Sequence, residues 1–130
     1  VNMLADQGLA LNKKENIVDS RKHLRFKKLS NEEKNRIIAQ DPAYGRVICR
    51  CETITEGEIL DALRSPIPPV SLDGIKRRAG TGMGRCQSGF CGPKVLEIIA
   101  KFRNVPYEDV LQDDTGSYIL TGETKSGGVK

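Results

Sequence analysis

The chain has 130 residues, 38% of them hydrophobic and none of them Trp, which is enough for one modest core. Its formal net charge is only +4 and its aromatic residues are few, so nucleic-acid binding is disfavoured. No stretch has the apolar length of a transmembrane segment, and no secretory signal is recognisable. We therefore expect a cytoplasmic protein that reaches a membrane only through a partner.

The first forty residues predict an irregular start followed by one strand and one helix. Residues 1–22 show no hydrophobic period and are interpreted as a linker, whereas residues 23–27 alternate polar and apolar, which predicts a strand. Ser30 and Glu33 form a capping box that predicts a helix to about Ile38. His23 is the only histidine, and we interpret it as structural rather than as a ligand.

Helix start signals recur in the middle of the chain. Residues 46–52 are predicted to be extended, and Thr55 with Glu58 then forms a second capping box. Ser71 is predicted to begin another helix that ends at Gly80, a left-handed cap. Each of these two helices is also predicted to have a hydrophobic staple, formed by Ile54 with Ile59 and by Val70 with Ile75.

A further helix is predicted from Gly92-Pro93, with proline in its first turn. Residues 106–111 predict a short helix, and residues 118–120 allow a short strand. The expected fold class is mainly α, a small helical domain with an irregular N-terminal extension and short strands. The apolar side chains of the helix after Gly92 are expected on one face, namely Val95, Ile98, Ile99 and Phe102.

The four cysteines occur in two tight pairs, Cys49-x-Cys51 and Cys86-x4-Cys91, each just before a predicted helix. Backbone N–H groups at a helix start lower thiol pKa values and donate hydrogen bonds to sulfur. The glycines between the helices allow the backbone to pass close to a bulky ligand. This spacing predicts one shared metal site built from all four cysteines.

Spacing alone leaves the identity of the metal open. A disulfide between Cys49 and Cys51 would close a very small strained ring, whereas one between Cys86 and Cys91 is geometrically feasible. Four thiolates suit tetrahedral zinc and suit a [2Fe–2S] cluster equally well. Neither pair has the Cys-x2-Cys spacing usual in zinc sites, which weakens zinc without excluding it.

Three segments carry a resemblance to a known family: residues 47–52, residues 55–59 and residues 78–93. They resemble the [2Fe–2S] domain of the bacterioferritin-associated ferredoxin type (BFD-like) over about residues 44–112. The resemblance implies a small helical fold that holds the cluster between two loops, each leading into a helix. It also implies the four ligands Cys49, Cys51, Cys86 and Cys91.

Within that family, residues 41–45 and 104–110 resemble the C-terminal domain appended to FAD-dependent oxidoreductases, especially anaerobic-type glycerol-3-phosphate dehydrogenases. The resemblance implies that residues 1–43 are the tail of a missing flavoprotein domain, that residues 44–112 bind the cluster, and that residues 113–130 are a C-terminal tail. The partners would be the parent flavoprotein domain and an electron-acceptor protein or a quinone. This chain would be a non-catalytic fragment of the oxidoreductase, and we identify no catalytic residue in it.

Arg50 and Arg85 each adjoin a predicted ligand and are our candidate cofactor-binding residues. A [2Fe–2S] cluster with four thiolates has a charge of minus two, and reduction makes it minus three, so nearby cations favour the reduced state. Phe90 is predicted either to shield the cluster or to be a core residue. The alternatives to electron transfer are a structural zinc-binding interaction module and a cluster-sensing or cluster-delivery domain. Zinc found in the isolated domain would not distinguish these alternatives, because a cluster domain that loses its iron can take up zinc.

Overall fold

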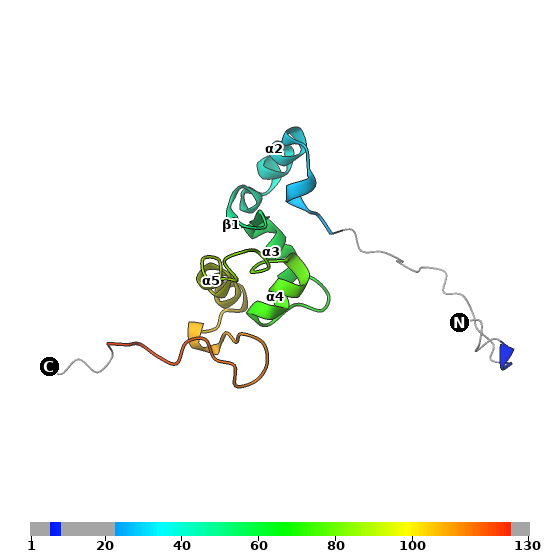
Figure 1. Ribbon diagram of the computed structural model, residues 1–130. Helices are drawn as coiled ribbons and strands as arrows, with labels where there is room; N and C mark the ends of the chain where they lie inside the picture. Colours follow the sequence, from blue (N-terminus) through cyan, green and yellow to red (C-terminus); the bar gives the residue numbers. More distant parts are fainter. Residues whose placement is uncertain (1–5, 9–22, 126–130) are drawn as a thin grey trace.

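The computed structural model describes residues 6–8 and 23–125. Figure 1 shows α3, α4 and α5 gathered together, with α2 at one end of the molecule. The only sheet among the described residues has two antiparallel strands. In chain order the elements are η1 (Phe26–Lys28), α2 (Asn31–Gln40), η2 (Pro42–Gly45), β1 (Val47–Cys49), β2 (Ile54–Thr55), α3 (Glu56–Leu63), α4 (Leu72–Ala79), α5 (Gly92–Arg103) and η3 (Tyr107–Asp109).

The hydrophobic core lies where α3, α4 and α5 meet. Ile59, Ile75 and Ile99, one from each helix, are completely buried there. Cys49 and Cys91 belong to the same cluster of buried side chains, each 1% exposed. The core therefore extends directly into the cysteine loops.

None of the helices formed by the described residues is long and apolar enough to cross a membrane.

The helix boundaries confirm the start and stop signals. Both capping boxes form, with the Ser30 side chain accepting from the Glu33 N–H and Thr55 accepting from the Glu58 N–H. The first of these helices, α2, continues beyond Ile38 to Gln40. α4 ends at Gly80 in the left-handed conformation, with φ of 93°, and α5 begins at Gly92 with Pro in its first turn.

The strand predicted over residues 23–27 is wrong, because Phe26–Lys28 form a turn of 3-10 helix. Its Phe26 N–H donates to a side chain, Glu58 Oε1, at 3.2 Å, and not to a partner strand. The Phe26 ring is buried and stacks on Tyr44. The alternation of polar and apolar residues over 23–27 is thus explained by the burial of the Phe26 side chain and not by a strand. The linker predicted over residues 1–22 falls almost entirely outside the described residues.

Smaller expectations also need correction. Val70 is 53% exposed, so it forms no hydrophobic staple with buried Ile75. Phe102 is 43% exposed, although the other three apolar residues predicted with it are buried. Residues 106–111 contain a single 3-10 turn, and Tyr118 makes only an isolated bridge to Leu111. These segments lie at the edge of the core, where apolar side chains are easily left in contact with water.

The buried carboxylate of Glu58 joins the N-terminal segment to the helical unit. Its Oε1 accepts from the Phe26 N–H, and its Oε2 accepts from the N–H and the hydroxyl of Thr55. Arg25 adds a second attachment, donating from Nη1 to the Ala79 carbonyl at 2.8 Å. Residues 25–28 are thus fixed to α3 and to the end of α4.

We expect Glu58→Ala to destabilise the chain by about 2–4 kcal/mol, because it leaves buried donors without acceptors. The matched control is Glu33→Ala, since Glu33 has the same place in the exposed capping box of α2. Water can replace that carboxylate, so its loss should cost far less. Urea unfolding of both variants measures the difference. Equal losses would contradict the role assigned to Glu58.

Candidate metal centre

The four cysteines lie on two loops that meet beside the core. Cys49 ends β1 and Cys51 lies in the turn that follows, which Thr53 closes with φ of 56°. Cys86 lies in the loop after α4, and Cys91 immediately precedes α5 as its N-cap residue. All four are free thiols.

The two sequence pairs come together crosswise. Cys51 Sγ donates a hydrogen bond to Cys86 Sγ across 3.6 Å. Cys91 lies close enough to Cys49 for the interaction between them to raise the pKa of the Cys91 thiol. Each contact therefore takes one sulfur from the early loop and one from the late loop. Among the described residues, no three cysteine, histidine or acidic side chains form a group that could hold a single metal ion.

The two sulfur contacts differ in their access to water. Cys49 and Cys91 are each 1% exposed and pack among core side chains. Cys51 is exposed, and Cys86 is intermediate. One half of the candidate centre is therefore buried, whereas the other half lies at the surface.

Backbone donors favour the thiolate form at the exposed half. The Phe90 N–H donates to Cys86 and lowers the pKa of that thiol, and the hydrogen bond from Cys51 lowers it further. The N–H of Ser88 acts in the same direction. Gln87 and Ser88 both have positive φ, 45° and 72°, which turns the loop back toward Cys86.

Burial has the opposite effect at the inner half. It raises the pKa of the Cys91 thiol, and the interaction with Cys49 raises it further. The Gly82 N–H and the Ser88 side chain partly oppose this rise. A bound cation would reverse the balance, since metal coordination deprotonates a thiol outright.

Two glycines allow close approaches at the cysteine loops, Gly84 between the two loops and Gly82 within the loop after α4. A Cβ on Gly84 would lie 2.2 Å from Cys51 Cβ and 3.3 Å from its Sγ. A Cβ on Gly82, whose φ is 74°, would lie 2.2 Å from Ser88 Oγ. At these two positions the backbone approaches as closely as the absence of a side chain allows.

These residues fit a metal–thiolate group. Two sulfurs bound at about 2.3 Å to one tetrahedral metal lie about 3.8 Å apart, close to the 3.6 Å between Cys51 and Cys86. The backbone N–H groups of Gly82, Ser88 and Phe90 are suitable outer donors to sulfur. The sequence predicted the glycine-rich loop, but not which of its backbone N–H groups interact with which cysteine sulfur.

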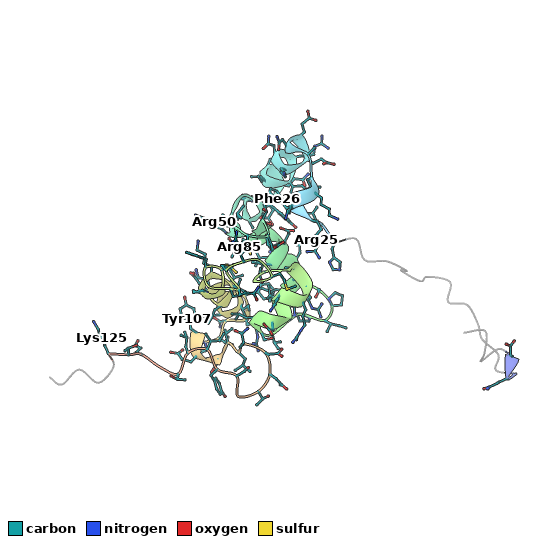
Figure 2. The ribbon with its side chains drawn as sticks, in the orientation of Figure 1. Arg25, Phe26, Arg50, Arg85, Tyr107 and Lys125 are labelled. Atoms are coloured by element: carbon teal, nitrogen blue, oxygen red, sulfur yellow. The ribbon has the colours of Figure 1, made fainter. Side chains whose placement is uncertain are left out.

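Arg50 and Arg85, the candidate cofactor-binding residues, are both exposed (Figure 2). Neither takes part in an ion pair with another described residue. Phe90 is 84% exposed, so its interpretation as a core residue is wrong. Glu52, which sequence reasoning missed, pairs with Lys27 at 3.9 Å beside Cys51.

Comparison with known proteins places this geometry in context. Residues 47–101 match the family described as the BFD-like [2Fe-2S] binding domain. The chain is 44% identical over 127 residues to a glycerol 3-phosphate dehydrogenase of Caloramator mitchellensis, covering 97% of this chain and 26% of that protein. It is 40% identical over 79 residues to an opine oxidase subunit of Rhizobium meliloti, covering 61% of this chain and 14% of that protein.

A more distant relative is an anaerobic glycerol-3-phosphate dehydrogenase subunit of Escherichia coli K12, 28% identical over 65 residues. That match covers 50% of this chain and 12% of the relative. The chain thus spans about a quarter or less of the length of these relatives. No solved structure matches it significantly.

Proposed function

Because residues 47–101 belong to the BFD-like [2Fe-2S] binding family, we propose that this chain is the electron-transfer part of a flavin-dependent oxidoreductase. Cys49, Cys51, Cys86 and Cys91 would hold the cluster within a mainly α domain formed by residues 44–112. The observation that carries the proposal is the meeting of sulfurs from both loops, with Cys51 and Cys86 only 3.6 Å apart.

Crosswise pairing supports a binuclear cluster over zinc. In a [2Fe–2S] cluster each iron takes two protein thiolates, so two separate sulfur pairs are what the group requires. A single zinc ion would require all four sulfurs around one point. The described residues offer two pairs and no group of three around one ion.

The chemistry that the cluster supplies when bound is the transfer of one electron at a time. The protein's own contribution is to hold four thiolates in place and to stabilise their charge. The N–H groups of Phe90 and Gly82 donate to the sulfurs of Cys86 and Cys91. The core side chains around Cys49 keep water from the inner half.

The parent enzyme that we propose is a glycerol-3-phosphate dehydrogenase with FAD in the part that precedes residues 1–43. The 97% coverage of the chain by the Caloramator mitchellensis enzyme supports this choice, since the opine oxidase match covers only 61%. Electrons would pass from the flavin through this domain to an acceptor protein or a quinone. Four free thiols suit a reducing compartment, so we propose that the protein is cytoplasmic. Residues 113–130 would form a C-terminal tail.

Anaerobic purification followed by iron, sulfide and zinc analysis tests the proposal. We expect about two irons and two sulfides per chain, and absorption that bleaches on reduction and returns on reoxidation. A colourless chain with stoichiometric zinc after anaerobic purification would indicate a structural module instead. A cluster lost during repeated reduction and reoxidation would indicate a sensing or delivery domain.

We expect Arg50→Ala and Arg85→Ala each to lower the midpoint potential of the cluster, on the order of tens of millivolts. Removing a nearby cation disfavours the more negative, reduced state. Redox titration measures the shift. Arg36→Ala on α2 is the control, because that exposed arginine lies on a different element from both cysteine loops. Potentials unchanged by both loop substitutions would remove this role.

A further inference from the structure

Two of the cysteine sulfurs lie within reach of each other at the surface. Cys51 Sγ is 3.6 Å from Cys86 Sγ. A disulfide bond is about 2.05 Å long, so the remaining gap is about 1.5 Å, which rotation of two side chains can close. Cys51 is exposed and Cys86 is partly exposed, so a dissolved oxidant can reach both sulfurs.

Contacts within the polypeptide hold these two sulfurs near each other. The loop around Cys86 is closed by hydrogen bonds to the Gly84 carbonyl from the Gln87 N–H at 3.1 Å and from the Gln87 side chain at 2.9 Å. The Gly89 N–H donates to the Cys86 carbonyl at 2.9 Å. Gly84 lies so close to Cys51 that a Cβ on it would be 2.2 Å from Cys51 Cβ. These contacts favour the approach of the two sulfurs in a chain that has yet to receive its cluster.

The other pairings of the four cysteines are less accessible. Cys49 and Cys91 are each 1% exposed and lie in the core, where a dissolved oxidant does not reach them. In an unfolded chain, Cys86 would pair with Cys91, because closing a loop over 5 residues instead of 35 is about twentyfold more probable. Burial of Cys91 opposes that pairing in the folded chain.

We propose that Cys51 and Cys86 form a redox-modification site, in which a small-molecule disulfide oxidises the cluster-free chain to an inter-loop Cys51–Cys86 disulfide. The bond takes up two of the four proposed ligands, so the chain must be reduced before it can receive a cluster. The disulfide itself does not depend on the proposed function, whereas its consequence for cluster loading rests on it. Exposed disulfides are readily reduced, so the modification is reversible.

The reaction is a thiol–disulfide exchange in two steps. One cysteine loses its proton to solvent, and its sulfur attacks the small disulfide, which forms a mixed disulfide and releases one small thiol. The second cysteine attacks the protein sulfur of the mixed disulfide in the same way and releases the second small thiol. The chain loses two electrons and two protons, and the small disulfide gains both.

Disulfide mapping tests the pairing. The full chain is freed of metal by a chelator under reducing conditions, separated from the reductant, incubated anaerobically with oxidised glutathione and then alkylated. Trypsin cleaves after Arg50, between the two early cysteines, and chymotrypsin cleaves after Phe90, between the two late ones. Mass spectrometry of the peptides therefore assigns every pairing. We expect the Cys51–Cys86 linkage to exceed every other by about tenfold, since access governs the exchange.

The same reaction in concentrated guanidinium is the control. Chain length alone then decides the pairing, so the Cys86–Cys91 linkage should exceed the Cys51–Cys86 linkage by about twentyfold. A folded chain in which Cys86–Cys91 or Cys49–Cys91 is the main linkage overturns the inference. A folded chain that forms no disulfide overturns it as well.

Cys51→Ser tests the partner of Cys86 by trapping the intermediate. Cys51 is exposed, so its replacement leaves the core intact. Without this partner, Cys86 should stop at the mixed disulfide and retain about one glutathione per chain. Cys91 should not complete the exchange, because it is buried in the core. The mass of the intact chain measures the adduct. A variant that forms a disulfide as fast as the unsubstituted chain, and retains no glutathione, overturns the inference.

The consequence for cluster loading is tested by adding ferrous iron and sulfide anaerobically to the oxidised and the reduced chain. The initial rate of cluster formation is compared, because sulfide itself slowly reduces disulfides. We expect a rate about tenfold lower for the oxidised chain, restored by a phosphine reductant. Equal rates overturn the control of loading. A reduced chain that forms no cluster overturns the proposed function, whereas the mapped disulfide is judged by its own result.

Discussion

Cys91→Ser is expected to be isolated with almost no iron, compared with about two irons per chain in the unsubstituted protein. A serine hydroxyl does not deprotonate as a thiol does and is a poor ligand for iron–sulfur clusters. The position offers no replacement ligand, because Cys91 is 1% exposed and its neighbours are mainly core side chains and Cys49. The loss should therefore be close to complete.

The same substitution should make the chain much easier to unfold. Cys49 and Cys91 belong to the hydrophobic core, so metal binding and folding are coupled at this point. Iron analysis and thermal unfolding, both under anaerobic conditions, measure the two effects. Met83→Ser is the control, because it removes an exposed sulfur from the same loop without removing a thiol. A Cys91→Ser protein with normal iron would show that Cys91 is not a ligand.

Local signals in the sequence predicted much of this fold. The capping boxes at Ser30 and Thr55 and the glycine at position 80 each depend on a few neighbouring residues, and each forms as expected. The meeting of the cysteine pairs was also predictable, because unrelated buried cysteines rarely occur as two tight pairs before two helices. The structure places Cys51 Sγ 3.6 Å from Cys86 Sγ, and the joint binding of one centre by all four cysteines stays a prediction.

Tertiary contacts determined what the sequence could not show. The alternation at residues 23–27 resembles a strand, but the buried Glu58 carboxylate takes the Phe26 N–H that a partner strand would have needed. Val70 has the spacing of a staple residue, yet it remains 53% exposed. Which cysteine faces water is equally invisible in the spacing, because it depends on how the loops lie against α5.

Gly84→Ala is expected to lower the affinity for the cluster at least tenfold, about the size of effect known for outer-shell changes. The added Cβ would lie 2.2 Å from Cys51 Cβ, where ordinary carbon contacts begin near 3.4 Å. Either the loop or Cys51 must then move by about 1 Å. Metal–sulfur distances tolerate only about 0.2 Å, so such a movement would break the Cys51 and Cys86 pairing.

Gly92→Ala is the matched control for this prediction. Gly92 directly follows Cys91, but a Cβ there would meet only Ser88 Cβ at an ordinary 3.6 Å. It lies at the start of α5, where alanine is a better helix former than glycine. Iron content, visible absorption and unfolding of both variants can be measured side by side. If Gly84→Ala binds iron as well as Gly92→Ala does, the close approach of residue 84 to Cys51 is not what brings the exposed sulfurs together.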